Sequence, residues 1–183
     1  METKNDTAPA DNDLAVFISR LPVSAGSYVL QLHLSQAYQV QVGRFAQAIF
    51  PAGEYIYLGS ALGPGGLRAR LGRHLRATGK HQWHIDYLRS VADVHAMGYG
   101  LARDEAGNQP MECAWSQALV NLPGAFIPLA GFGAGDCRSG CQAHLVGFPV
   151  SSTGMLENLQ KIYSLAILNC RIPKTPGELP DHR

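Results

Sequence analysis

Short connections between strand-like runs constrain the fold of this chain more than any other feature. Residues 28–34 (YVLQLHL) and 38–42 (YQVQV) alternate between apolar and polar side chains, as half-buried strands do. Only three residues separate the two runs, which favours a hairpin, because parallel strands need a long crossover. Residues 45–50 predict a short third strand and residues 54–60 (EYIYLGS) a strong fourth one. The sequence therefore predicts a mostly antiparallel sheet.

Helical patterns follow these strands. Leu67, Leu71 and Leu75 are spaced four apart and form an apolar stripe on a helix that begins after a glycine-rich loop. Pro110 fits the first turn of a later helix that reaches Asn121. The remaining expectations are helices at 84–90 and 155–168, a strand at 91–99, an ordered loop at 123–147 and a polar tail from 171. This order predicts an α+β fold, in which a small, mostly antiparallel sheet is flanked by helices.

The length of 183 residues suits one domain with a real core. We expect a disordered leader over 1–20, the domain itself over 25–148, and a C-terminal helix and tail over 151–183. No apolar run is long enough to cross a bilayer, and residues 1–13 carry no signal pattern. The expectation is a cytoplasmic protein without a membrane partner, whose cysteines are thiols or metal ligands rather than disulfides.

A basic segment on the first helix is a candidate phosphate site. The net charge of +1 argues against strong, nonspecific binding of nucleic acid, but the arginines are gathered locally. On a helical wheel Arg70 and His74 flank one side of the leucine stripe, Arg68 flanks the other, and Arg73 and Arg76 point to solvent. A guanidinium and an imidazole at the margin of the core could hold a phosphate. The alternative is an ordinary solvated amphipathic helix.

Tyr28 and Tyr57 each lie close to a glycine in a strand-like run, and the second run leads through Gly59 into the basic helix. Singly, each tyrosine fits a core or rim position of a sheet. Glu112 falls in the first turn of its helix, where a carboxylate is expected as a cap; because it shares a face with Trp115, it is also a candidate ligand for a divalent cation. His84 lies in the segment 82–88 (QWHIDYL), for which a structural hydrogen-bond network is the default interpretation.

Cys137, Cys141 and His144 fall within eight residues of a glycine-rich segment. Three such ligands at this spacing suggest a structural zinc site that is one ligand short. Cys113, His84 or His81 could complete it. Buried or free thiols are the alternative.

Together these residues resemble the GIY-YIG nuclease superfamily. Gly26-Ser27-Tyr28 and Tyr57-Leu58-Gly59 correspond to its two motifs, Arg70-Leu71-Gly72-Arg73-His74 to its helix, and Glu112 to its metal-holding glutamate. The resemblance covers residues 25–148. It is stronger to an uncharacterised branch whose members sometimes accompany an endonuclease III-type DNA glycosylase. The separation of the two motifs is longer than in the nucleases, which implies an inserted hairpin, and Ser27 replaces an apolar residue.

The resemblance implies a metal-dependent endonuclease that hydrolyses DNA phosphodiester bonds, in DNA repair. Glu112 would hold Mg²⁺ or Mn²⁺, Arg70 would stabilise the developing charge, and Tyr28 or Tyr57 would position or deprotonate the attacking water. The further roles that it implies are a proton carrier or phosphate contact at His74, a close backbone turn at Gly59, and substrate contacts at Arg68, Arg73 and His84.

The expected partners are DNA, bound weakly or by its structure, and a DNA glycosylase. Two alternatives stay open on the same fold. One is a catalytically silent module that binds nucleic acid or protein, and the other is a scaffold stabilised by zinc.

Overall fold

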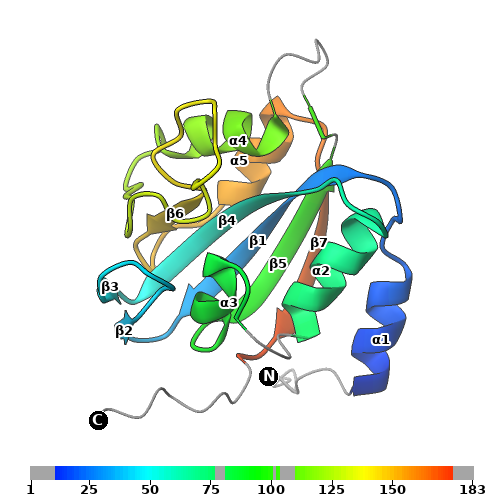
Figure 1. Cartoon of the computed structure of the whole chain (residues 1–183), viewed down its shortest axis with the longest axis horizontal. Helices are drawn as coiled ribbons and strands as arrows, with labels where there is room; N and C mark the ends of the chain where they lie inside the picture. The colour runs from blue at the N-terminus through cyan, green and yellow to red at the C-terminus, as the bar shows by residue number, and fades with distance from the viewer. Residues whose placement is uncertain (1–10, 77–80, 101, 104–109, 175–183) are drawn as a thin grey trace, which may run out of the picture.

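One five-stranded sheet organises the molecule (Figure 1). The computed structural model describes residues 11–76, 81–100, 102–103 and 110–174. The strand order is β6-β4-β1-β5-β7, and every neighbouring pair is antiparallel. The strands are β1 (Gly26–Leu34), β4 (Gly53–Ala61), β5 (Asp93–Gly100), β6 (Leu145–Phe148) and β7 (Ala166–Ile172). A second sheet pairs β2 (Tyr38–Val40) with β3 (Ala48–Phe50).

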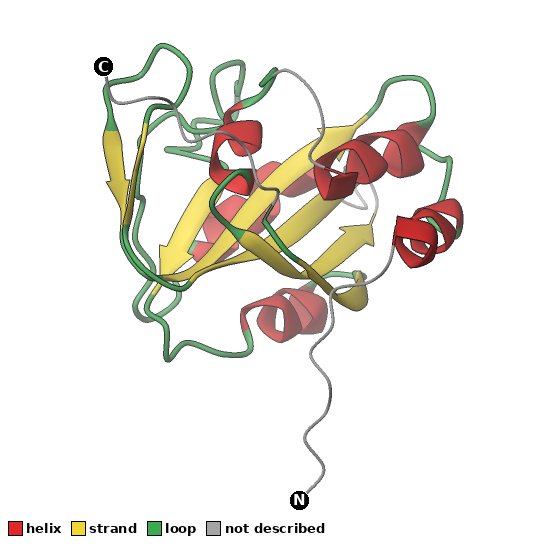
Figure 2. Cartoon of the chain, turned by 90° about the horizontal axis from the view of Figure 1, so that it is seen from below, coloured by secondary structure: helices red, strands yellow, loops and turns green. Residues whose placement is uncertain are grey.

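Helices cover both faces of the five-stranded sheet, as Figure 2 shows from below. One layer contains α1 (Asp11–Ser19), α2 (Gly66–Arg76) and α3 (His84–Arg89), and the other contains α4 (Met111–Leu119) and α5 (Met155–Ile162). Successive side chains of β1 point to opposite faces of the sheet. Leu30 belongs to the core cluster that contains Leu71 of α2, whereas Val29 belongs to the cluster that contains Trp115 of α4. The predicted α+β class is confirmed. Among the described residues, no helix combines the length and apolar character that a membrane span requires.

The predicted hairpin between residues 28–34 and 38–42 is wrong. β1 pairs with β4 and β5, and β2 pairs instead with β3, so that Tyr38 lies opposite Phe50. Phe50 is buried in the main core, and this burial ties the β2–β3 unit to the sheet. The unit occupies the stretch between the two tyrosine motifs, which is where the resemblance implied an insertion.

Two further expectations are corrected by edge strands. The loop predicted over 123–147 ends in β6, and the helix predicted over 155–168 ends at Ile162 and gives way to β7. Glycine lets β7 approach closely, because a Cβ at Gly98 would lie 3.1 Å from the carbonyl oxygen of Ala166. The structural unit therefore extends beyond Phe148, since β7 closes one edge of its sheet.

The predicted leader is also corrected in part. Residues 11–19 form α1, whose Ile18 is buried against α2. Gly72 permits this contact, because a Cβ there would lie 2.9 Å from Ile18 Cγ2. Residues 1–10 and the tail from 175 lie outside the described residues.

Candidate active-site cleft and metal cluster

A cleft of about 540 Å³ lies beside β4, where that strand continues past the end of β6. β6 pairs with residues 54–57 of β4, and the Leu58 N–H donates to the carbonyl oxygen of His144 at 2.9 Å, so the edge of β4 beyond Leu58 is left for the cleft. The cleft draws its lining from β1, β4, α2, α4 and the segment before β6. The predicted site residues that line it are Tyr28, Tyr57, Gly59, Arg70, Glu112, Cys137 and His144.

The packing of Tyr28 against Gly59 links the two sequence motifs. The two residues lie directly opposite on β1 and β4, and a Cβ at position 59 would lie only 2.5 Å from the Tyr28 hydroxyl oxygen. The phenol ring therefore occupies the space that a side chain at position 59 would fill. Glycine in the second motif is required by tyrosine in the first.

A chain of polar groups runs from Tyr28 into the core. The Tyr28 hydroxyl lies 2.8 Å from His74 Nε2, and His74 Nδ1 lies 3.7 Å from Asp86 Oδ1. Burial lowers the pKa of His74, so its imidazole is neutral near pH 7. When the proton of the neutral His74 ring is on Nδ1, which faces Asp86, Nε2 accepts the hydrogen bond from Tyr28. His74 thus lies behind the cleft wall and contacts the cleft through Tyr28.

Both cleft tyrosines keep their protons near neutral pH. Burial raises the pKa of Tyr28 well above its usual value, and the neighbouring Tyr57 raises it further. Burial also raises the pKa of Tyr57 to about 12. Neither hydroxyl is therefore a free phenolate that could act as a base on its own.

Arg70 is held at the cleft by an aromatic ring. Its guanidinium carbon lies 4.1 Å from the centre of the Trp83 ring, and the guanidinium carbon of Arg73 lies 4.0 Å from the same centre. Arg73 also donates two hydrogen bonds, of 3.0 and 2.9 Å, to the Asp86 carboxylate. Burial alone would raise the pKa of Asp86, but the nearby His74 imidazole and hydrogen bonds from Arg73 and the backbone hold it far below its usual range. Of these two arginines only Arg70 lines the cleft.

Three residues expected to contact substrate do not line this cleft: Arg68, Arg73 and His84. Arg68 Nε donates to the carbonyl oxygen of Leu21 at 2.8 Å, which joins α2 to the end of α1. His84 Nδ1 accepts from the backbone N–H of Gly133 at 2.9 Å. Each of the three holds neighbouring segments together.

Glu112 faces the cleft from the first turn of α4. Ser27 Oγ donates to Glu112 Oε2 at 2.6 Å, so the serine of the first motif orients the carboxylate. Asp136 places a second carboxylate in the lining. Its only sequence signal is its place beside Cys137, and our sequence reasoning missed it together with the lining residues Trp83, Arg103, Arg138 and Ser139.

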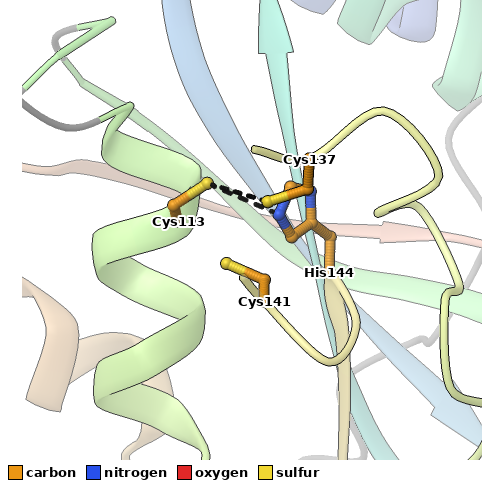
Figure 3. A group of neighbouring side chains, drawn as sticks. All are labelled: Cys113, Cys137, Cys141 and His144. Carbon is orange, nitrogen blue, oxygen red and sulfur yellow. Dashed lines mark hydrogen bonds between the residues drawn. The ribbon is translucent and has the colours of Figure 1, made fainter. Parts of the chain in front are cut away.

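Cys113 completes the predicted metal cluster (Figure 3). It projects from α4 toward Cys137, Cys141 and His144, and the four ligand atoms all lie within 4.8 Å of one another. Cys113 Sγ is 3.6 Å from both Cys137 Sγ and His144 Nε2. A Cys₃His set of this kind could bind a metal such as zinc in tetrahedral geometry. All four cysteines of the chain are free thiols.

Two thiols of this cluster, Cys113 and Cys141, resist deprotonation, and a bound cation would favour their thiolate forms. Burial raises the pKa of Cys113, and burial together with the neighbouring thiols raises that of Cys141 to about 12. Metal coordination stabilises thiolates directly. Because Cys113 directly follows Glu112, a metal in the cluster would fix the helix turn that carries the cleft carboxylate.

Comparison with known proteins gives one match. A family model described as a domain of unknown function, DUF123, matches residues 27–167. No curated protein and no solved structure matches the chain. The matched range contains β1, the cleft and the metal cluster.

Proposed function

The chain belongs to the DUF123 family, a domain of unknown function, and we propose that it is a metal-dependent endonuclease of the GIY-YIG type. Its substrate would be a DNA phosphodiester bond, in DNA repair, and its proposed partner is a DNA glycosylase. The observation that carries the proposal is the convergence of Tyr28, Tyr57, Arg70 and Glu112 on one cleft from β1, β4, α2 and α4. Free cysteines suit a reducing compartment such as the cytoplasm.

The donor set of the cleft suits Mg²⁺ or Mn²⁺. These cations bind one or two carboxylates and complete their shell with water and phosphate oxygens, and Glu112 and Asp136 are two carboxylates in one lining. When bound, the cation would neutralise charge on the scissile phosphate. Ser27 fixes one oxygen of Glu112, which leaves the other oxygen for a ligand.

Arg70 is a side chain that would bring positive charge to the scissile phosphate, in addition to the charge of the cation. Stacking on Trp83 restricts its guanidinium, and a restricted donor that faces developing charge loses little on reorganisation. In this mechanism Arg70 binds the non-bridging phosphate oxygens and stabilises the extra charge of the pentavalent transition state.

Tyr28 and His74 would handle the proton of the attacking water. As water attacks phosphorus and the bond to the leaving sugar oxygen breaks, the water proton would pass to the Tyr28 oxygen while Tyr28 gives its own proton to His74 Nε2, 2.8 Å away. The leaving oxygen would take its proton from solvent. His74 is neutral and able to accept it. The Asp86 carboxylate, 3.7 Å from Nδ1, stabilises the resulting imidazolium. The relay explains how a tyrosine with a raised pKa could assist, since no free phenolate is formed.

The proposal is tested by incubating the chain with branched, nicked and single-stranded DNA in Mg²⁺ or Mn²⁺. We expect cleavage of at least one substrate, and its loss in Glu112→Gln, which keeps the size of the side chain but removes its charge. Glu157→Gln, on α5 outside the cleft lining, is the matched control. Salt-sensitive binding without cleavage would favour the catalytically silent module. Cleavage that survives Glu112→Gln would reject the assigned site.

Gly59→Ala is expected to impair cleavage by displacing the Tyr28 side chain. The new methyl group would overlap the Tyr28 hydroxyl, so the ring must leave its place and its hydrogen bond to His74. We expect cleavage to fall by about 10²-fold or more, the usual weight of a general acid–base contact. Gly63→Ala is the control, because a Cβ there meets nothing within 4 Å. Cleavage rates of the two variants, measured beside their thermal midpoints, check the expectation; equal rates would contradict it.

A further inference from the structure

A second group of metal-ligand side chains lies on the same sheet, away from the cleft. His33 on β1, Glu54 on β4 and His95 on β5 each offer a ligand atom, and these atoms lie within 4.8 Å of one another. Along β1, His33 is five residues from Tyr28, which lines the cleft, or roughly 17 Å at the rise of a strand. The group is therefore distinct from both the cleft and the Cys₃His cluster.

Strand pairing brings these three side chains together. His33 and Glu54 lie directly opposite each other, and such residues share one face of a sheet. The register between β1 and β5 shifts between Gln31 and Leu32, which leaves His95 as an extra residue of β5. A bulge of this kind re-aims a side chain. Here it brings His95 Nδ1 to 3.9 Å from Glu54 Oε1.

Glu54 is the centre of the group. Its Oε1 lies 2.7 Å from His33 Nδ1, and its Oε2 accepts a 3.0 Å hydrogen bond from Gln31 Nε2. The two imidazole rings are stacked, with centres 4.8 Å apart and planes 13° apart. The Glu54 side chain is only 10% exposed, whereas that of His95 is 35% exposed. Gln31 thus fixes one carboxylate oxygen of Glu54, and the other oxygen lies near both imidazoles. The partly exposed His95 connects the group to solvent.

We propose that His33, Glu54 and His95 form a second metal site, which takes zinc or a similar divalent transition metal. Two imidazoles and one carboxylate are the donors that zinc uses in three-ligand sites, where water fills the open position. Mg²⁺ and Ca²⁺ prefer oxygen ligands alone and are disfavoured here. Burial lowers the pKa of His95, so its imidazole is free to coordinate near neutral pH. Because the two rings are stacked nearly parallel, at least one imidazole would have to rotate out of the stack to bring the three donors onto one ion.

Cobalt binding to the tag-free full chain tests this site, because Co²⁺ reports its donor type. Thiolate ligands at the Cys₃His cluster give a charge-transfer band, whereas nitrogen and oxygen ligands give only d–d absorption. With excess Mg²⁺ present to occupy the cleft carboxylates, we expect two Co²⁺ per chain, and one fewer in His33→Ala and in His95→Ala with the thiolate band unchanged. His81→Ala, which removes an exposed imidazole outside the group, should keep both ions.

Glu54→Gln gives a second measurement if the histidine variants do not fold. It keeps the shape of the side chain and removes its charge, and we expect the affinity of the thiolate-free site to fall by about 10-fold or more. Unchanged stoichiometry in both histidine variants would overturn the proposal. So would an unchanged affinity in Glu54→Gln, or loss of the second ion in His81→Ala.

Discussion

Arg70→Ala is expected to lower the rate of DNA cleavage by about 10²- to 10³-fold, the usual cost of one preorganised donor at a transition state. The guanidinium of Arg70 lines the cleft and stacks on Trp83, so under the proposed function it would face the phosphate without having to be ordered during the reaction. Because its effect is largest in the transition state, kcat should fall much more than the affinity for DNA. Single-turnover cleavage and a binding isotherm at the same salt concentration measure the two effects.

Arg76→Ala is the matched control for that experiment. Arg76 lies on the same helix and is exposed, but it does not line the cleft. Both variants remove one positive charge from α2, so a general electrostatic role would weaken both equally. Similar losses in the two variants would contradict a specific role for Arg70. Arg70→Lys should restore only part of the rate, since an ammonium cannot form the bidentate contact.

Cys113→Ser is expected to remove one equivalent of zinc and to lower the thermal midpoint by about 10 °C. The estimate follows from about 3–4 kcal/mol of lost ligand stabilisation, at roughly 2–4 °C per kcal/mol for a chain of this size. The physical reason is that Cys113 is the only cluster ligand on α4, and the other three come from the segment before β6. Without it, a metal bound to the other three residues could no longer join the helix to that segment.

Cys170→Ser is the control for the cluster. Cys170 lies on β7, is partly buried and is absent from the cluster, so its removal tests the loss of a thiol without the loss of a ligand. Elemental analysis and thermal unfolding with and without a chelator measure the two variants. Equal zinc content in Cys113→Ser and the unaltered chain would reject the cluster as a metal site. A chelator should lower the midpoint of Cys170→Ser by more than that of Cys113→Ser, which has already lost the cluster metal.

The strands β1 and β4 and the helix α2 could be predicted because their patterns are local. Alternation over residues 28–34 gave β1, and the strand-like run over residues 54–60 gave β4, each to within two residues at either end. The leucine stripe placed α2, and its three leucines are buried as expected. In each case the residues that decide the element are its own, and both strands are nine residues long, whereas β6 has four.

The edge strands were missed for the opposite reason. β6 has only four residues, and all of them are buried, so no alternation marks it. β7 follows a real helix closely, and most of its residues are only partly buried or exposed. An edge strand is defined by a partner far away in sequence. For β7 that partner is β5, whose Gly98 allows the backbones to approach.

By itself the sequence determined which residues were available for the cleft and the cluster: the tyrosine and glycine motifs, Arg70, Glu112 and the Cys-Cys-His group. Only the tertiary structure decided which of them meet. In the structure Cys113, and not His81 or His84, is the fourth cluster residue. Arg73 binds Asp86, and a bulge places His95 beside Glu54. The physical reason is that a ligand set depends on distances between side chains, and those distances follow from strand register and helix packing, which no local pattern encodes.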